Sequence, residues 1–114
     1  MIKTVTIAGK PVDLKATGST LIKYRNQFGR DLINDFQAVQ TAFETEGEIN
    51  GETFDIVAKL TYTMAKQADK TITASLEDWL DEFDYFPISE FAADVIMLWA
   101  SSLQTQSDLK VKNV

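Results

Sequence analysis

The stretch that decides the fold is residues 2–16, IKTVTIAGKPVDLKA. Apolar and polar residues alternate over 2–7 and again over 12–16, which predicts two β-strands that share one apolar face. The four residues between them, AGKP at 8–11, have turn chemistry, because glycine tolerates positive φ and proline cannot donate to a strand ladder. The sequence therefore predicts a β-hairpin.

Pairing across that four-residue turn sets Ile7 opposite Val12 and Val5 opposite Leu14, with all four side chains on one face. The opposite face is polar. A single hairpin is marginally stable in water, so its apolar face has to pack against another element. The remaining sequence supplies helices for that purpose.

Helical patterns occupy residues 19–103. The first helix follows a cap-rich start at 17–20 and ends at Gly29, and Asp31 caps the second. After an expected exposed loop over 44–52, a third helix begins at Thr53, and a fourth and a fifth follow Ser75 and Pro87. Apolar residues at helical spacing, the expected core, include Leu32, Phe36, Val39, Phe43, Val57, Met64, Val95, Leu98 and Trp99.

The predicted fold class is α+β and mostly α, with an N-terminal β-hairpin packed on a bundle of about five helices. Residues 1–103 form one globular domain in this prediction, with the hairpin in 2–16 and the helices in 19–103. A chain of 114 residues with 45% apolar residues is large enough to bury a core. The polar, unpatterned segment 104–114 is predicted to be a flexible C-terminal tail.

The composition argues against an enzyme. The chain has no cysteine and no histidine, which removes thiolate metal sites, the usual general base and the common nucleophile pairs. The carboxylates of Asp78, Asp81 and Glu82, and the pair Asp31 and Asp35, have helical spacing and could offer oxygens to a divalent cation. We interpret them as solvated helix faces, and we expect no catalytic residues, no metal and no cofactor.

The net charge of −6 is unevenly distributed. Residues 1–30 carry six basic residues and one acidic residue, a net charge of +5, whereas the other 84 residues carry −11. Because the two parts are complementary, we expect the protein to self-associate. The acidic balance disfavours nucleic-acid binding. The longest apolar run, 95–100, is too short to span a membrane, and the N-terminus lacks a signal-peptide pattern, so we expect a cytoplasmic protein.

A cluster of large apolar residues interrupts the acidic second half. The junction 83–88 reads FDYFPI, and acidic residues surround it. These aromatics could fill the core at a hinge, or they could form a docking patch for a partner helix. For the second interpretation the candidate partner-binding residues are Trp79, Phe83, Tyr85 and Phe86.

Four segments, taken in order, resemble a known family. They are GKPVDLK at 9–15, YRNQFGRDL at 24–32, WLDEF at 79–83 and VIMLW at 95–99. In this order and spacing the chain resembles the tail assembly chaperones of long-tailed phages and prophages of Gram-positive bacteria. The resemblance covers about residues 2–103, and the segment at 24–31 is its most specific part.

The resemblance implies a non-enzymatic role in virion assembly. Such chaperones bind the long, helical, aggregation-prone tape measure protein in the host cytoplasm, and they keep it soluble until tail tube subunits polymerise around it. The tape measure protein is therefore the expected partner, with the tail tube protein as a second candidate, and the chaperone is expected to be absent from the mature virion.

The resemblance also implies a longer second product made by translational frameshifting. Val111, Lys112 and Asn113 can be encoded by GTA AAA AAC, which contains a slippery heptamer. We therefore expect the slip site there, with 104–114 as a linker to a further domain. The nucleotide sequence of the gene decides this point.

A different class of function stays open. The stretch 71–109 contains no basic residue and eight acidic ones, which is typical of a small acidic regulator or nucleic-acid mimic that binds a basic protein surface. Such a protein would array its carboxylates on one exposed surface. The basic N-terminal part and the apolar junction argue against this alternative.

Overall fold

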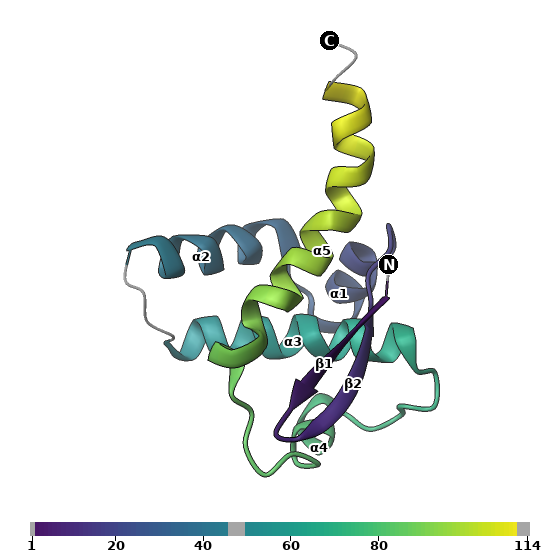
Figure 1. The fold of residues 1–114 in the computed structure, drawn as a ribbon, viewed down its shortest axis with the longest axis vertical. Helices are drawn as coiled ribbons and strands as arrows, with labels where there is room; N and C mark the ends of the chain where they lie inside the picture. Colours follow the sequence, from purple (N-terminus) through teal and green to yellow (C-terminus); the bar gives the residue numbers. More distant parts are fainter. Residues whose placement is uncertain (1, 46–49, 112–114) are drawn as a thin grey trace.

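A computed structural model describes residues 2–45 and 50–111 of the chain. In chain order the elements are β1 (Ile2–Ile7), β2 (Lys10–Lys15), α1 (Thr20–Phe28), α2 (Leu32–Thr45), α3 (Gly51–Ala68), α4 (Leu76–Leu80) and α5 (Ile88–Val111). The two strands form one antiparallel sheet (Figure 1). The structure therefore confirms the mostly helical α+β fold with an N-terminal hairpin and five helices in the described residues.

The hairpin turn is tighter than predicted. Ile7 pairs with Lys10, so the turn consists of Ala8 and Gly9 rather than of residues 8–11. Both turn residues have positive φ, 51° and 82°, which is the signature of the type I′ turns that match the twist of a hairpin. Lys10 and Pro11 belong to β2 instead.

The predicted pairing was consequently wrong, although the predicted face was right. Val5 lies opposite Val12, a shift of two residues from the expected register. Because side chains alternate with a period of two, a shift of two keeps the same residues on the same face. Val5, Ile7 and Leu14 are buried and Val12 packs against the core at its edge, as predicted.

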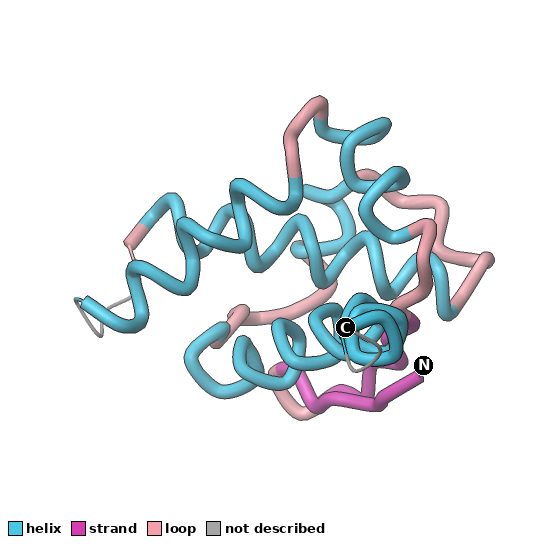
Figure 2. The backbone as a smooth tube through the Cα atoms, turned by 90° about the horizontal axis from the view of Figure 1, so that it is seen from above, coloured by secondary structure: helices cyan, strands magenta, loops and turns pink. Residues whose placement is uncertain are grey.

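Helix α3 is the centre of the molecule. It contacts β2, α1, α2, α4 and α5. Eleven of its residues are buried, including Ile56 and Leu60, which lie off its main apolar stripe. Figures 1 and 2 show the hairpin and α5 together on one side of α3. A helix that is apolar on several sides is expected to be surrounded by other elements.

Two helix boundaries near the middle of the chain differ from the prediction. Helix α2 continues to Thr45, and α3 begins at Gly51 rather than at Thr53. Asn50 is the N-cap of α3, because its side chain accepts a hydrogen bond of 2.8 Å from the backbone N–H of Thr53. The predicted loop over 44–52 is therefore shorter, and residues 46–49 of it lie outside the described residues.

The predicted cap of α4 and the predicted end of α1 are present, but Ser19, the N-cap of α1, makes no side-chain capping hydrogen bond. Ser75 accepts from the backbone N–H of Asp78 at the start of α4, and Gly29 ends α1 in a left-handed conformation. Asp31 accepts from the backbone N–H of Ile33 at the start of α2. These residues fix where the helices begin and end, and the connections between the helices are therefore short.

The last helix is longer than predicted. Helix α5 runs to Val111, so an end at Leu103 was wrong, and 104–111 are helical rather than irregular. This segment contains no glycine or proline that would stop a helix. Its outer half extends past the other elements (Figure 1). Residues 112–114, where part of the proposed slip site falls, lie outside the described residues. Within the described ranges, none of the helices combines the length and apolarity needed to cross a bilayer.

Candidate functional site

The four aromatic residues proposed for partner binding divide into two groups. Trp79 and Phe83 are buried, with exposed fractions of 3% and 8%. Phe86 is half-buried and packs against the core, whereas Tyr85 is 60% exposed. Tyr85 is therefore the most accessible of the four to a partner, and Phe86 is accessible only in part.

Phe86 holds the junction together. Its ring makes edge-to-face contacts with four others, and the centroid distances are 5.0 to 5.9 Å: Phe54, Trp79, Phe83 and Phe91. Such pairs contribute about 0.5–1.5 kcal/mol beyond the burial of their area. The rings come from α3, α4, the α4–α5 connection and α5. The junction therefore has a structural role in joining these elements.

A hollow of about 490 Å³ lies between the tip of the hairpin and α4. We call it the aromatic hollow, because the edges of Trp79 and Phe83 line it although both rings are mostly buried. Its other lining residues are Lys10, Pro11, Val12, Asp13, Ala68, Asp69, Ile72 and Glu82. It is a recess with an apolar interior and charged residues among its lining.

Lys10 joins the hairpin tip to the helical part at this hollow. Its Nζ donates a hydrogen bond of 2.6 Å to the backbone carbonyl of Glu82 and lies 5.6 Å from the centroid of the Phe83 ring. Lys10 can reach α4 because it lies opposite Ile7, on the packed face of the hairpin. The two-residue turn thus places a cation against the aromatic cluster.

Three exposed carboxylates, Asp13, Asp69 and Glu82, form what we call the acidic rim of the aromatic hollow. Hydrogen bonds from the hydroxyl and the backbone N–H of Thr71 lower the pKa of Asp69 below its ordinary value. Lys10 is the one basic residue that lines this hollow. The rim is therefore negatively charged at neutral pH.

A second hollow, of about 300 Å³, lies between α1 and α3. We call it the lysine hollow, because Lys23, Lys66 and Lys70 line it together with Asn26, Gln27, Thr63, Gln67 and Ile72. In the described part of the chain none of its three lysines forms an ion pair. Lys66 instead lies over the ring of Tyr62, 5.2 Å from its centroid. The hollow gathers positive charge on an acidic protein.

A buried hydrogen-bond network fixes the inner wall of the lysine hollow. The hydroxyl of Thr20 donates to Oε1 of Gln67 at 2.7 Å, and Nε2 of Gln67 donates to the hydroxyl of Thr17 at 3.0 Å. Thr20 and Gln67 are both buried. The start of α1 is thereby held against the C-terminal half of α3.

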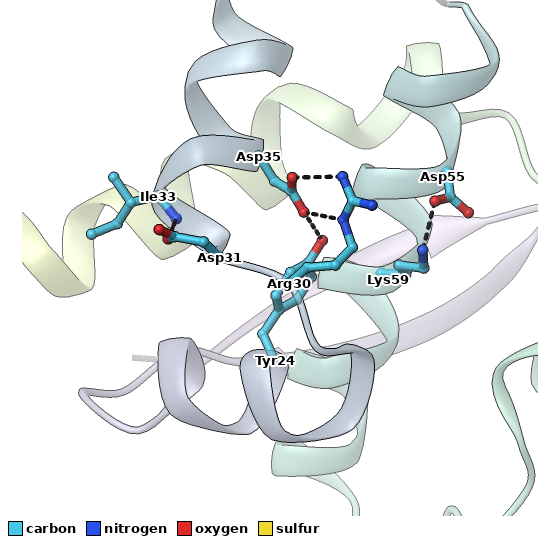
Figure 3. Close-up of polar contacts among 7 residues, drawn as sticks. All are labelled: Tyr24, Arg30, Asp31, Ile33, Asp35, Asp55 and Lys59. Carbon is cyan, nitrogen blue, oxygen red and sulfur yellow. Dashed lines mark hydrogen bonds and ion pairs between the residues drawn. The ribbon is translucent and has the colours of Figure 1, made fainter.

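The polar centre of the α1–α2 corner is Asp35, shown in Figure 3. Its carboxylate accepts two hydrogen bonds from Arg30, at 2.7 and 2.9 Å, and one from the hydroxyl of Tyr24, at 2.7 Å. Burial opposes ionisation, but the hydrogen bonds from Arg30 and Tyr24 outweigh it and lower the pKa of Asp35. Burial, and then the hydrogen bond to Asp35, raises the pKa of Tyr24.

Asp31 and Asp35, considered above as a cation site, make separate contacts. Asp35 is bound to Arg30 and Tyr24, while Asp31 caps α2. No set of three or more acidic side chains converges as a metal site in the residues that the structure describes. Asp78 on α4, and Asp81 and Glu82 directly after it, are exposed.

Sequence reasoning missed both hollows. Ile72 and the hairpin tip lie far from the aromatic junction in sequence, and only the two-residue turn brings Lys10 next to Phe83. The spacing of Lys66 and Lys70 does predict that they lie together, since residues four apart share one face of a helix. The contribution of Lys23 depends on how α1 packs on α3.

Comparison of the chain with models of protein families, with curated proteins and with solved structures found no match.

Proposed function

We propose that this chain is a tail assembly chaperone that binds the tape measure protein of a long-tailed phage in the host cytoplasm. It keeps that protein soluble during tail assembly and does not stay in the mature virion. The observation that carries the proposal is the aromatic hollow, a recess with apolar side chains in its lining and an acidic rim. The order of the four segments that resemble this family supports it.

The shape and chemistry of the recess fit an apolar side chain on a helical partner. Helices that dock in grooves use apolar anchors at intervals of three or four residues, and polar groups around the anchor set its specificity. Trp79, Phe83 and Ile72 supply the apolar wall for such an anchor, and Asp13 and Glu82 supply charges at its edge. A tape measure protein is long and helical, so it offers many such anchors.

The test is co-expression of the chain with a tape measure protein, with the soluble fraction of the latter as the readout. The variant is Val12→Asp, which puts a charge into the aromatic hollow at a half-buried position. The matched control is Ile22→Asp, because Ile22 is 48% exposed on α1 and lines neither hollow. Circular dichroism verifies that both variants fold.

The chaperone proposal predicts a soluble tape measure protein with the native chain and with Ile22→Asp, and a loss of solubility with Val12→Asp. A tape measure protein that precipitates equally with and without the native chain would contradict it. Gene order gives an independent check, because a chaperone gene should lie directly before a very long tape measure gene.

Self-association belongs to the same proposal, since a cover for a long rod requires many copies. Residues 1–30 carry a net charge of +5 and the other 84 residues carry −11, so contacts between these two regions of different copies would be ionic. The tail tube protein is proposed as a second partner, at the stage when the tape measure protein is transferred.

One observation favours the alternative of an acidic regulator that binds a basic protein surface. Glu77, Asp78, Asp81 and Asp84 are all exposed on or just after α4. Competition against DNA for a basic nucleic-acid-binding protein tests this alternative. Displacement of the DNA by the native chain, lost when Glu77 and Asp81 are both replaced by Lys, would favour the regulator over the chaperone.

A further inference from the structure

We propose that the aromatic hollow and the lysine hollow form one continuous docking groove for a single amphipathic helix whose acidic and basic residues are segregated toward opposite ends. This inference rests on the proposed function, since it describes the kind of partner segment that the chaperone would hold. It assigns to the groove a polarity that fixes the direction of the bound helix.

The two hollows meet at Ile72. This residue lines both of them and is half-buried in the connection between α3 and α4. Its side chain packs against the core from the loop, so it contributes apolar surface to both hollows. An apolar face that spans both hollows would cover Ile72 at its middle and reach Trp79 and Phe83 at one end.

The charges at the two ends of the groove are opposite. Asp13 and Glu82 supply negative charge at one end, where Lys10 also lies, and Lys23, Lys66 and Lys70 supply three positive charges at the other. Asp69 directly precedes Lys70 in the chain and lies near the boundary between the two ends. Complementary charge fixes the orientation of a partner and disfavours the reversed arrangement. The occupant therefore places basic residues at the aromatic hollow and acidic residues at the lysine hollow.

Helix energetics select the direction of that occupant. Acidic residues stabilise the N-terminal turn of a helix and basic residues stabilise the C-terminal turn. A helix with its acidic residues in the N-terminal half and its basic residues in the C-terminal half therefore places the N-terminal half at Lys66 and Lys70. Its C-terminal half then lies at the acidic rim. The backbone dipole of the bound helix is positive at its N-terminus and opposes this orientation, so the side-chain charges of the helix are what fix its direction.

The same polarity disfavours other occupants. Nucleic acid would be attracted by the lysine hollow, but the carboxylates of Asp13, Asp69 and Glu82 would repel its phosphates. The base-free stretch 71–109 of a second copy would fit the lysine hollow and would likewise be repelled at the acidic rim. A segment that carries both signs of charge, in separate halves, satisfies both ends.

The probes are two synthetic helical peptides of about 20 residues, roughly 30 Å long. Both have the same composition and the same leucine face. In the segregated peptide all glutamates lie in the first half and all lysines in the second, while in the mixed peptide they alternate along the polar face. Fluorescence anisotropy of labelled peptides at low salt measures binding to the native chain. We expect the segregated peptide to bind about tenfold more tightly.

The protein variants are the pair Lys66→Glu and Lys70→Glu, which reverses one end of the groove. The matched control is Lys15→Glu with Arg25→Glu, because it changes the net charge by the same amount and neither residue lines a hollow. We expect the first pair to abolish the preference for the segregated peptide and the control pair to retain it. Circular dichroism verifies folding, and the peptide comparison on the native chain is decisive even if a variant unfolds.

Equal affinity for the two peptides would overturn the groove, as would an equal loss of preference in both pairs of variants. Sedimentation that shows self-association abolished by the Lys66 and Lys70 changes, without any peptide preference, would assign the lysine hollow to a second copy and overturn the proposal. The co-expression assay is separate. If the chain keeps a tape measure protein soluble but binds the two peptides equally well, the groove proposal is wrong and the chaperone proposal still stands.

Discussion

The hydroxyl of Tyr24 donates a hydrogen bond of 2.7 Å to the carboxylate of Asp35, eleven residues further along the chain. The same carboxylate binds Arg30 through two hydrogen bonds. Asp35 is buried, with an exposed fraction of 6%, so its charge is compensated at the α1–α2 corner rather than by water. Asp35 is the shared acceptor of this network, so its removal would leave both Tyr24 and Arg30 without this partner.

Replacement of Asp35 by Asn should lower the stability by about 2 kcal/mol at pH 7, because Asn removes a charged acceptor from a mostly buried network. The folded-state pKa of Asp35 is lowered, so its contribution is present above the unfolded value of about 3.9 and is lost as the pH falls through the folded value. Urea unfolding of native and variant proteins from pH 7 to pH 2.5 measures this. A stability gap that stays constant down to the lowest pH would contradict the assigned network.

The hairpin turn makes a second prediction. Ala8 has a φ of 51°, a left-handed conformation that asparagine tolerates better than alanine, and Asn-Gly is the preferred sequence for this turn. Ala8→Asn should therefore stabilise the protein by about 0.5 kcal/mol, and Gly9→Ala should destabilise it by about 1 kcal/mol or more. Thermal unfolding measures both. Gly18→Ala is the control, because Gly18 lacks a positive φ, and a Gly9→Ala variant as stable as this control would contradict the left-handed turn.

Phe86 and Tyr85 are adjacent but should behave differently. Phe86→Ala removes a ring that contacts four others, so it should cost about 2–3 kcal/mol of stability, less than for a fully buried phenylalanine. Tyr85→Ala should leave stability within about 0.5 kcal/mol, because the ring is 60% exposed. Chemical denaturation measures both values.

The same two variants test the docking interpretation of the aromatic junction. Capture of a tape measure fragment by folded Tyr85→Ala should weaken if the exposed ring contacts the partner. Full capture by Tyr85→Ala, together with unfolding of Phe86→Ala, would restrict the junction to a role in the core.

Self-association should depend on salt. Exposed charges are screened beyond about 10 Å at 0.1 M ionic strength, so an ionic contact between copies weakens as salt rises. Sedimentation velocity at high protein concentration should show larger species in dilute buffer than in about 0.5 M sodium chloride, because the screening length is shorter at the higher salt concentration. A strict monomer at low salt would argue against the open array of copies.

Much of the fold could be predicted from local sequence patterns. The features that could not be predicted depend on tertiary contacts or on segments with little local pattern. The alternation in 2–16 predicts the buried face of Val5, Ile7 and Leu14, because that face depends on a period of two. The pairing is not predictable in the same way, since turns of two and of four residues preserve the same face. The longer α5 was missed because a polar segment without a breaker carries little signal for or against a helix.

The candidate site was less accessible to sequence reasoning than the fold. The junction 83–88 was recognisable from its aromatic content, but which rings are buried depends on contacts with Phe91 of α5 and with Phe54 of α3, which is 32 residues before Phe86 in the chain. The two hollows require Ile72, Lys10 and Lys23 to meet residues from other elements. Such meetings are set by packing around α3 and have no local sequence pattern.

The contact between the first strand and the last helix has a consequence for synthesis. Lys3 on β1 forms an ion pair with Asp94 on α5, at 3.4 Å, and Phe91 of α5 completes the ring contacts of Phe86. A ribosome delivers the hairpin first and α5 last, so a nascent chain leaves the aromatic cluster open until its final helix has emerged. A polypeptide truncated after Pro87 should consequently unfold without a cooperative transition, whereas the full chain should show one. Folding of the aromatic cluster therefore waits until α5 has emerged from the ribosome.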